Sequence, residues 1–443
     1  MKLFNSMHNK IEELKTIKEN EVSMYVCGPT VYNYPHIGNA RPIIVFDTLI
    51  NVLEALKYKV TFVSNYTDVD DKIINTAIKE GKSEEEVSEF FINAYNSDRL
   101  ALNARMPDIA PKVTQTMDEI IEFIQLLINK GYGYQADGDV YFRVGKINEY
   151  GKLSNQKIDD LVVGARIDEN SNKENPLDFT LWKKTDVGIN WDSPWSKGRP
   201  GWHSECVVMI NKQFSEHLID IHGGGMDLKF PHHENEIAQS IGAYDTNIAN
   251  YWIHNGMVNI NGDKMSKSIG NVLWVKDLIK EHGGNVIRWM MLSAHYRSPI
   301  NISDETLDAA KKELDKVINA LKIASLKLQL NNYESDELDS ALYNEFLQAM
   351  SDDLNTPNGF KAVFETNKKL NNELRNKEMN NEEIAKLKNS LSQMMKVLGI
   401  KIEDVILSNE DKELYNKWEQ EKANRNFDKA DEIRKVLLDK GIL

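Results

Sequence analysis

Cysteine is nearly absent from this chain: its 443 residues contain only Cys27 and Cys206. Two cysteines so far apart in sequence cannot build a disulfide framework, so we expect a reducing compartment and a cytoplasmic location. The chain also lacks any run of about 18 apolar residues, the length needed to span a membrane. Its first residues, MKLFNSMHNKIEELK, have no apolar stretch or cleavage signature of a signal peptide. We therefore expect no association with a membrane.

Positive charge is in deficit. The chain has 54 Lys and Arg against 68 Asp and Glu, a net charge of −14. This balance argues weakly against a nucleic-acid binder, because phosphate contacts need cations. Net charge describes the whole surface, however, and local groups such as Lys264 and Lys267 can still bind an anion. With 41% hydrophobic and 28% charged residues, the composition is that of a globular protein, and the length allows about three domains.

The first 130 residues contain a strand–helix–strand pattern. Residues 22–27 are apolar and end at a Gly-Pro pair, residues 38–57 have a helical pattern, and residues 58–65 form a second β-prone run. This spacing predicts a βαβ unit with parallel strands. Two amphipathic helices are predicted next, at 83–104 and 114–131.

From 131 to 200 the pattern changes to a hairpin with an Asp-Gly turn and then to a polar stretch, which indicates an insertion between two halves of the sheet. A regular pattern resumes with a helix near 201–214, a strand at 217–222, a helix at 232–243 and a strand at 251–260. After about residue 302 apolar residues recur every three or four positions, which predicts four to six helices in a bundle.

The predicted fold class is therefore α/β: a Rossmann-like, doubly wound parallel sheet with an inserted connective subdomain, followed by an all-α helical bundle. We divide the chain into a first half of the α/β domain (1–130), the insertion (131–200), a second half of the α/β domain (201–260), a loop containing Lys264 and Lys267 with its following helices (261–302) and a helical domain (303–443).

Two short motifs predict a phosphate site. HIGN, at His36 to Asn39, follows a strand and opens a helix, whose N-terminus presents free N–H groups and a positive dipole end. KMSKS, at Lys264 to Ser268, combines two lysines with two serines in a loop. Either motif alone is as compatible with an ordinary turn or a basic surface loop. In a doubly wound sheet both can converge at the carboxyl ends of the strands, where nucleotides bind.

Four further residues form a candidate metal site. His232 and Glu236 are four apart on a predicted helix, so they share a face, whereas Glu234 would point nearly the opposite way and His233 about 100° round. Together with Cys27 and Cys206 they make a set of two sulfurs, a nitrogen and an oxygen, which suits zinc. Taken singly, each cysteine could equally be a buried free thiol and the histidine a residue at the edge of the core.

HIGN paired with KMSKS resembles the signature of class I aminoacyl-tRNA synthetases. Nearly the whole chain is similar to the cysteinyl-tRNA synthetase family in particular. The resemblance is carried by CGPTVYNYPHIGNARP, YTDVDDKI, GWHSECVVM, GGGMDLKFPHHENEIAQS, NGDKMSKSIGN and DDLNTP. It implies that cysteine and ATP form cysteinyl-adenylate and pyrophosphate, and that the cysteinyl group then passes to the terminal adenosine of tRNA(Cys).

The resemblance also implies roles for individual residues. It places one zinc ion on Cys27, Cys206, His232 and Glu236, with the substrate thiolate also binding the metal. It places the ATP phosphates on His36, Gly38, Asn39 and Lys267, with Lys264 in the same catalytic group. It implies a cysteine pocket lined by Gly28, Thr30, Thr67, Trp202, His222 and Asp227. Asn39 stands where HIGH-type relatives have a second histidine, and its amide can still donate a hydrogen bond.

Zinc has a physical purpose in such an enzyme. Cysteine and serine differ by one atom, and an apolar pocket separates such pairs by only about 1–3 kcal/mol. A soft thiolate binds zinc far better than a hydroxyl does.

The phosphoryl chemistry needs positioning and charge stabilisation rather than a protein nucleophile, so we assign no covalent catalytic residue and expect Mg²⁺ with the ATP. We expect a monomer.

Three other functions share parts of this pattern. A ligase that joins activated cysteine to an amino sugar would have the same catalytic motifs but no need for the helices after 303. A non-catalytic tRNA-binding relative would not need intact HIGN and KMSKS. A nucleotidyltransferase of the same superfamily would not need the two cysteines. In the helical domain, Phe427 could stack on an anticodon base or serve as a core residue of the last helix pair.

Overall fold

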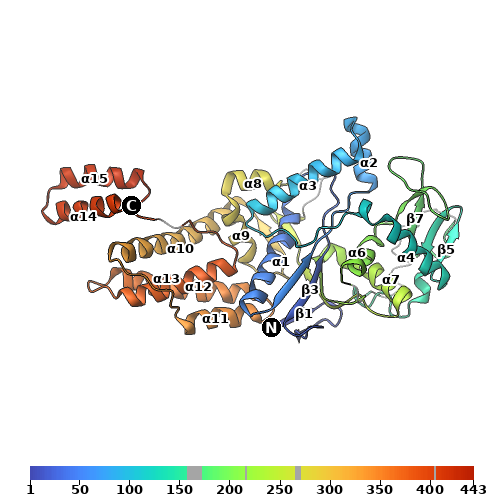
Figure 1. Ribbon diagram of the computed structural model, residues 1–443, viewed down its shortest axis with the longest axis horizontal. Helices are drawn as coiled ribbons and strands as arrows, with labels where there is room; N and C mark the ends of the chain where they lie inside the picture. Colours follow the sequence, from blue (N-terminus) through green and yellow to red (C-terminus); the bar gives the residue numbers. More distant parts are fainter. Residues whose placement is uncertain (157–171, 215–216, 265–270, 404–405) are drawn as a thin grey trace.

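The computed structural model of the chain describes residues 1–156, 172–214, 217–264, 271–403 and 406–443. Figure 1 shows an elongated molecule with a parallel sheet near its centre, an inserted antiparallel sheet at one end and a pair of helices, α14 and α15, at the other. Within the described residues, no helix is long and apolar enough to cross a membrane.

The central sheet has four parallel strands in the order β10-β9-β3-β4. Strands β3 (Glu21–Val26) and β4 (Lys59–Val63) are joined by α1 (Ile37–Ala55), and strands β9 (Ile219–Gly225) and β10 (Ala249–Asn255) by α7 (Glu234–Tyr244). The two βαβ units meet where β3 lies beside β9. The strand order reverses there, and this is the place where open α/β sheets bind ligands.

Helix α1 is apolar on almost every side. It packs on β4 and β9 of the sheet and, on its other side, on helices α9 (Gly284–Leu292) and α13 (Asn381–Val397). Because both sides are covered, most of its residues are buried, including the charged Arg41 and Asp47. The helix therefore holds the start of its own first turn, the HIGN segment, against the sheet.

The segment between the two halves of the sheet forms an antiparallel sheet in the order β5-β6-β7-β8. Its strands are β5 (Gly133–Ala136), β6 (Asp139–Phe142), β7 (Phe179–Lys184) and β8 (Gly198–Pro200). The hairpin predicted at the Asp-Gly turn is confirmed, with Asp137 and Gly138 between β5 and β6. Helices α3 (Glu84–Ala101), α4 (Met117–Asn129) and α6 (Glu205–Phe214) follow their predicted ranges, whereas α2 (Asp71–Glu80) was not predicted.

The single strand predicted at 251–260 is wrong. The chain forms β10 up to Asn255 and then β11 (Val258–Ile260), which belongs to another sheet with β12 (Asp263–Lys264) and β13 (Ile300–Ile302). The break lies at Gly256, whose N–H donates to the carbonyl of Tyr296 at 2.8 Å. A Cβ atom at this position would lie 2.5 Å from the carbonyl oxygen of Ser298, so the close approach of the two segments requires glycine.

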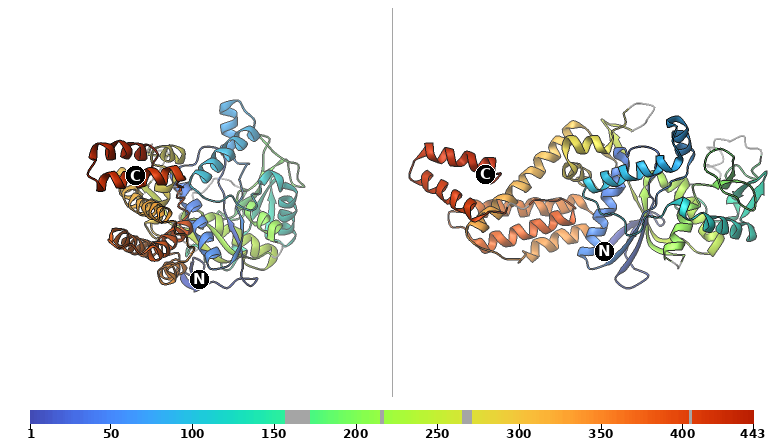
Figure 2. Two further views of the ribbon diagram at one scale, coloured as in Figure 1. Left: turned by 60° about the vertical axis from the view of Figure 1, so that its left-hand side comes forward. Right: turned by 45° about the horizontal axis from the view of Figure 1, so that its top comes forward.

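The helical region after residue 302 is confirmed. Its helices are α10 (Asp304–Leu330), α11 (Ser340–Ser351), α12 (Thr356–Arg375), α13, α14 (Asn409–Ala423) and α15 (Phe427–Asp439). Helices α10 to α13 pack side by side in every view, and α14 and α15 form a separate hairpin beyond them (Figures 1 and 2). Two further helices, α8 (Val275–His282) and α9, lie between the sheets and this region in the sequence. At the N-terminus, β1 (Lys2–Asn5) and β2 (Lys10–Glu13) form a hairpin that lies beside β10.

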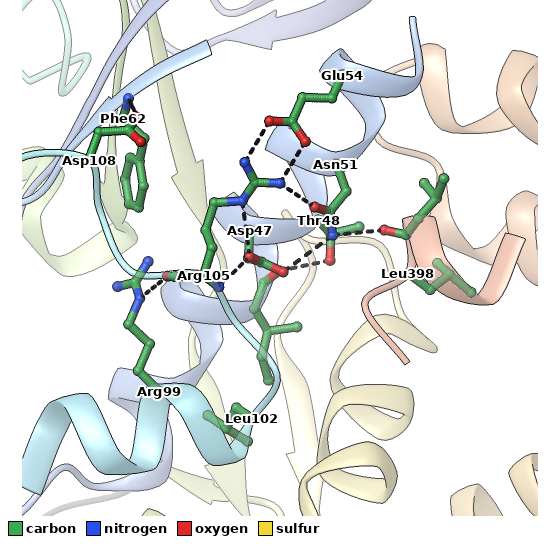
Figure 3. Close-up of polar contacts among 12 residues, drawn as sticks. Asp47, Thr48, Asn51, Glu54, Phe62, Arg99, Leu102, Arg105, Asp108 and Leu398 are labelled. Carbon is green, nitrogen blue, oxygen red and sulfur yellow. Dashed lines mark hydrogen bonds and ion pairs between the residues drawn. The ribbon is translucent and has the colours of Figure 1, made fainter. Parts of the chain in front are cut away.

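A buried ionic network joins the catalytic half to the helical bundle. Arg288 on α9 is fully buried; it pairs with Asp47 on α1 and donates to the carbonyl of Leu398 after α13. The same Asp47 accepts a hydrogen bond from the backbone N–H of Arg105 at 2.9 Å, and the Arg105 guanidinium binds Glu54 through two bonds of 2.6 and 2.7 Å (Figure 3). Charged side chains from three separate segments are thus paired at one joint.

Candidate functional site

A cavity of about 310 Å³ opens at the carboxyl ends of β3 and β9. Most of the residues that the sequence assigned to ATP and cysteine lie on its wall, together with the candidate zinc ligand Cys27. The ATP and cysteine residues on the wall are Gly28, Thr30, His36, Gly38, Asn39, Trp202 and Asp227. The HIGN turn and the end of β3 therefore face one pocket, as the spacing of nine residues between Cys27 and His36 suggests.

The first turn after β3 is set by a close approach to a neighbouring segment. The N–H of Gly28 donates to the side-chain oxygen of Asn65 at 2.9 Å. A Cβ atom on Gly28 would lie 1.6 Å from the carbonyl oxygen of Asn65, so only glycine fits here. The N–H of Cys27 donates to the carbonyl of Gly223 on β9 at 3.1 Å. These bonds place the Cys27 thiol above the point where the strand order reverses.

Cys27, Cys206, His232 and Glu236 converge at the base of this pocket. Their ligand atoms all lie within 4.8 Å of one another. The two sulfurs are 3.6 Å apart, and Cys206 Sγ lies 3.7 Å from His232 Nε2. Glu236 Oε1 lies 3.6 Å from Cys27 Sγ and 2.8 Å from His232 Nε2. Cys206, His232 and Glu236 are almost completely buried.

These separations suit a tetrahedral metal site. Zinc–sulfur bonds of about 2.3 Å and zinc–nitrogen or zinc–oxygen bonds of about 2.0–2.1 Å put ligand atoms roughly 3.3–3.8 Å apart. The three separations that involve sulfur fall in this range. The separation between His232 and Glu236 is shorter and must open by about half an ångström around an ion of that size. Two sulfurs with one nitrogen and one carboxylate oxygen are a donor set that zinc accepts.

Negative charge is concentrated in this cluster. Hydrogen bonding from Cys27 lowers the pKa of the Cys206 thiol to about 6 despite its burial. Burial alone would raise the pKa of Glu236, but His222 and His232 outweigh it and hold that pKa well below its usual range. Burial alone would lower the pKa of His232, yet Glu236 and Cys206 raise it to about 10. The negative charges of a thiolate and a carboxylate are costly in a buried site unless a cation lies beside them. A divalent metal ion can supply that positive charge.

A shell of histidines surrounds the four candidate ligands. Five of the ten histidines of the chain meet here: His203, His222, His232, His233 and His254. His222 Nε2 lies 2.6 Å from Glu236 Oε2, and His203 Nδ1 lies 3.0 Å from His232 Nδ1. Such contacts fix the orientation of metal ligands. His203 and His254 were not among the predicted site residues, although the spacing of three between His203 and Cys206 was a signal that could have indicated the first of them.

The position of His233 differs from the prediction. Its Nε2 lies 3.4 Å from Cys27 Sγ and its Nδ1 lies 2.8 Å from His254 Nε2, so it faces the cluster instead of pointing about 100° away. The predicted helix at 232–243 begins only at Glu234, and residues 229–233 form an irregular turn with Phe230 in an extended conformation. Cys27, His222, His233 and Glu236 accordingly form a second group that could hold a metal.

The HIGN turn is anchored by hydrogen bonds on both sides. The side-chain oxygen of Asn39 accepts from the N–H of His36 at 3.0 Å, which closes the first turn of α1. This bond uses the acceptor end of the amide, and the donor end is the part that can bind a phosphate oxygen. The N–H of Ile37 donates to the carbonyl of Leu273 at 2.8 Å, so the segment just before α8 lies against the HIGN turn.

The remaining predicted residues lie deeper or outside the described part of the chain. The Thr67 hydroxyl donates to buried Glu205 at 2.8 Å, and its backbone pairs with that of Thr30. His222 is fully buried behind Glu236. Lys264 ends β12, but its side chain and the whole of Lys267 lie outside the described residues. Trp202, 39% exposed, lines the pocket and stacks on His232 with ring centroids 4.3 Å apart.

The family models and the individual relatives that match this chain point to the same family. Residues 13–312 match the family described as "tRNA synthetases class I (C) catalytic domain", and residues 345–403 match the "DALR domain". The chain is 47% identical to the cysteine–tRNA ligase of Brevibacillus brevis, over 100% of this chain and 97% of that one. It is 46% identical to the cysteine–tRNA ligase of Clostridioides difficile with the same coverage.

Comparison with solved structures supports the fold. The methionyl-tRNA synthetase of Mycobacterium tuberculosis, in complex with methionyl-adenylate, aligns with a TM-score of 0.63 at 15% identity, over 85% of this chain and 89% of that one. A LeuRS–tRNA complex from Agrobacterium radiobacter aligns with a TM-score of 0.62 at 11% identity, over 88% of this chain and 84% of that one. At such low identity the likeness concerns the fold alone.

Proposed function

The chain belongs to the cysteine–tRNA ligase family of class I synthetases, and from this premise we propose how its own residues carry out the reaction. The enzyme activates L-cysteine with ATP and transfers the cysteinyl group to tRNA. In the first step a carboxylate oxygen of cysteine attacks the α-phosphate, and pyrophosphate leaves. In the second step a ribose hydroxyl at the 3′ end of tRNA attacks the carbonyl carbon of the adenylate, and AMP leaves.

Cys27, Cys206, His232 and Glu236 would hold a zinc ion, one per chain. The observation that supports this assignment is the convergence of their four ligand atoms within 4.8 Å in a largely buried site. Zinc bound there would supply a soft Lewis acid that favours a thiolate over a hydroxyl. The histidines behind the cluster would orient the ligands, and Trp202 would hold the ring of His232 in place from the pocket wall.

The cysteine pocket would be formed by residues around this cluster. Gly28, Thr30 and Asp227 lie on the cavity wall beside Cys27, and Asp227 is exposed, so its carboxylate is available to the substrate ammonium group. Thr67 and His222 are buried beneath the pocket, where their bonds to Glu205 and Glu236 support its floor. We therefore assign direct contact with cysteine to the first three residues and to Trp202, and a supporting position to the other two.

ATP would bind at the start of α1. The N-terminus of a helix attracts phosphate through its free N–H groups and its dipole. Gly38 lets the phosphates approach the backbone, and His36 and Asn39 can donate hydrogen bonds to them. Lys264 and Lys267 would stabilise the leaving pyrophosphate, and Mg²⁺ would accompany the nucleotide. The described segment at 273–275, which follows the KMSKS motif in sequence, pairs with the HIGN turn and supports this assignment.

The helices after residue 302 would bind the tRNA outside its acceptor end. Phe427 at the start of α15 is 63% exposed, so its aromatic ring is accessible and could stack on an unpaired base. The enzyme is expected to act as a monomer in the cytoplasm, where ATP and tRNA are available. We keep the division of the chain into five regions, at 1–130, 131–200, 201–260, 261–302 and 303–443, as part of this proposal.

One assay series tests this proposal. The purified protein should catalyse cysteine-dependent ATP–pyrophosphate exchange and then charge purified tRNA(Cys) with cysteine. Exchange without charging would favour transfer to a small acceptor, and no exchange at all would contradict the proposed activity. A metal analysis by atomic absorption should find one zinc per chain, and a metal-free but active protein would contradict the assigned cluster.

A further inference from the structure

Three aromatic side chains form a shelf beside the catalytic pocket, in which Phe90 is exposed, Tyr34 is half-buried and Phe91 is buried. The shelf consists of Tyr34, Phe90 and Phe91. The ring centroid of Tyr34 lies 5.9 Å from that of Phe90 and 5.5 Å from that of Phe91, and the two phenylalanines are 5.1 Å apart. All three pairs meet edge to face, which fixes the rings relative to one another. Phe90 is 50% exposed, an unusual position for a phenylalanine that has a packed neighbour on either side.

The shelf is continuous with the catalytic pocket. Tyr34 comes two residues before His36, and both Tyr34 and Phe91 line the cavity that contains Cys27 and Asn39. Phe90 continues the same aromatic surface outward along α3, where the cavity lining ends. Phe90 thus contacts two residues of the pocket lining and is itself accessible from solvent.

Positive charge borders the shelf although the chain as a whole is acidic. Lys276 Nζ lies 3.3 Å from the ring centroid of Tyr34, and Lys82 Nζ lies 5.8 Å from that of Phe90. Lys82 also binds Glu80 at 2.8 Å, whereas no ion pair of Lys276 occurs among the described residues. Nearby, Glu84 accepts from the N–H of Ile189 and is already occupied. Aromatic faces beside a lysine match a nucleotide, which has a flat base and an anionic phosphate.

We propose that Tyr34 and Phe90, with Lys276 beside them, bind the unpaired nucleotides at the 3′ end of the tRNA and guide the terminal adenosine into the pocket. This inference rests on the proposed function. Transfer requires a ribose hydroxyl of the tRNA to reach the adenylate, so unpaired nucleotides must cross the mouth of the pocket. Unpaired bases stack on aromatic side chains, and this contact does not depend on the identity of the base.

The test separates adenylate formation from transfer. Phe90→Ala should lower kcat/KM for tRNA charging by about 5- to 150-fold, the range for the loss of one base–aromatic stack. It should leave cysteine-dependent ATP–pyrophosphate exchange within about twofold of the wild type, since that reaction needs no tRNA. Phe90→Trp should restore charging. Leu100→Ala is the matched control, because Leu100 is an apolar residue on the same helix, 54% exposed and away from the pocket lining, and it should charge normally.

Binding measurements identify which part of the tRNA is involved. Fluorescence anisotropy should show that the wild type binds intact tRNA(Cys) more tightly than tRNA lacking its unpaired 3′ nucleotides, and that Phe90→Ala removes this difference. A kcat/KM for tRNA charging equal to that of the wild type in Phe90→Ala would overturn the inference. So would a rise in the KM for ATP during exchange, because the shelf would then hold the adenine of ATP. A wild-type protein without any exchange activity would instead contradict the proposed function itself.

Discussion

The sulfur atoms of Cys27 and Cys206 lie 3.6 Å apart, although 179 positions separate the two residues. One thiol follows a strand in the first half of the parallel sheet, and the other lies on α6 after the insertion. Neither residue has another cysteine to meet, so the only two thiols of the chain share one buried site with His232 and Glu236. The first prediction concerns this pair.

Cys206→Ser should weaken zinc binding and reduce the preference for cysteine over serine. A hydroxyl is a poorer zinc ligand than a thiolate, and losses at metal sites of this kind commonly cost at least about 10- to 100-fold in affinity. Atomic absorption after dialysis against a chelator measures the metal, and pyrophosphate exchange with each amino acid measures selectivity. Ile210→Val, a conservative change in the core on the same helix, is the control. Full zinc occupancy and unchanged selectivity in Cys206→Ser would remove this residue from the ligand set.

Arg288→Leu should destabilise the protein far more than Arg105→Leu. Both arginines contact Asp47, but Arg288 is fully buried and also binds the carbonyl of Leu398, while the Arg105 side chain is about one-third exposed. Removing one partner of a buried ion pair costs about 3–5 kcal/mol, whereas an exposed pair contributes about 1 kcal/mol or less. Urea unfolding followed by tryptophan fluorescence compares the two variants. Equal losses would show that burial does not govern this network.

Asp353→Ala should loosen the contact between the helical region and the N-terminal strand. Asp353 is buried in the DDLNTP segment; its carboxylate accepts from the N–H of Phe4 at 2.8 Å, the hydroxyl of Tyr296 at 2.7 Å and the guanidinium of Arg297 at 2.8 Å. Loss of this acceptor leaves three donors unsatisfied and should lower the free energy of unfolding by about 3 kcal/mol.

Two variants calibrate the Asp353 prediction. Asp353→Asn should lower the free energy of unfolding less than Asp353→Ala does, because asparagine tolerates the left-handed backbone (φ 59°) and keeps one acceptor oxygen. Asp352→Ala, at an exposed neighbour, should stay within about 0.5 kcal/mol of the wild type. The urea midpoint reports each change, and equal midpoints for the three variants would contradict the role assigned to Asp353.

Asp98→Asn should stabilise the protein at neutral pH but not in acid. Asp98 is 6% exposed on α3, and its Oδ2 has no hydrogen-bond partner among the described residues. Burial, aided by Asp277 and opposed by Lys276, raises the pKa of Asp98 to about 6. The folded state therefore binds a proton more readily than the unfolded state, so this group costs stability above its folded pKa and the cost disappears as the pH falls towards about 4.

The expected gain for Asp98→Asn is about 1 kcal/mol at roughly pH 7.5, after allowance for solvent screening, and close to zero at roughly pH 4. Urea midpoints of the variant and the wild type at the two pH values measure it. Asp315→Asn, at an exposed position on α10, is the control and should show no such pH-dependent gain. A gain that stays constant with pH would contradict the prediction, because it would show that the pKa of Asp98 is the same in the folded and unfolded states.

Much of the site could be predicted because its residues carry local signals. Rare cysteines, a helix start after a strand and two side chains four positions apart are visible without coordinates, and four of these residues do converge. The histidine shell was largely hidden. His203 and His254 come from different elements, and His233 reaches Cys27 only because residues 229–233 leave the helical path. The strand at 251–260 was misjudged for a similar reason, since the break at Gly256 depends on a segment about 40 residues away.

The sequence by itself determined the types of element, the parallel βαβ units, the helical region and the identity of the candidate ligands, because hydrophobic periodicity and side-chain chemistry act over a few neighbouring residues. Only the tertiary structure decided which histidines meet at the cluster, that Asp47 pairs with buried Arg288, and that Tyr34 and Phe90 form one surface at the mouth of the pocket. Those relationships depend on how distant segments pack, and burial makes a misplaced charge or an unfilled space costly enough to select one arrangement.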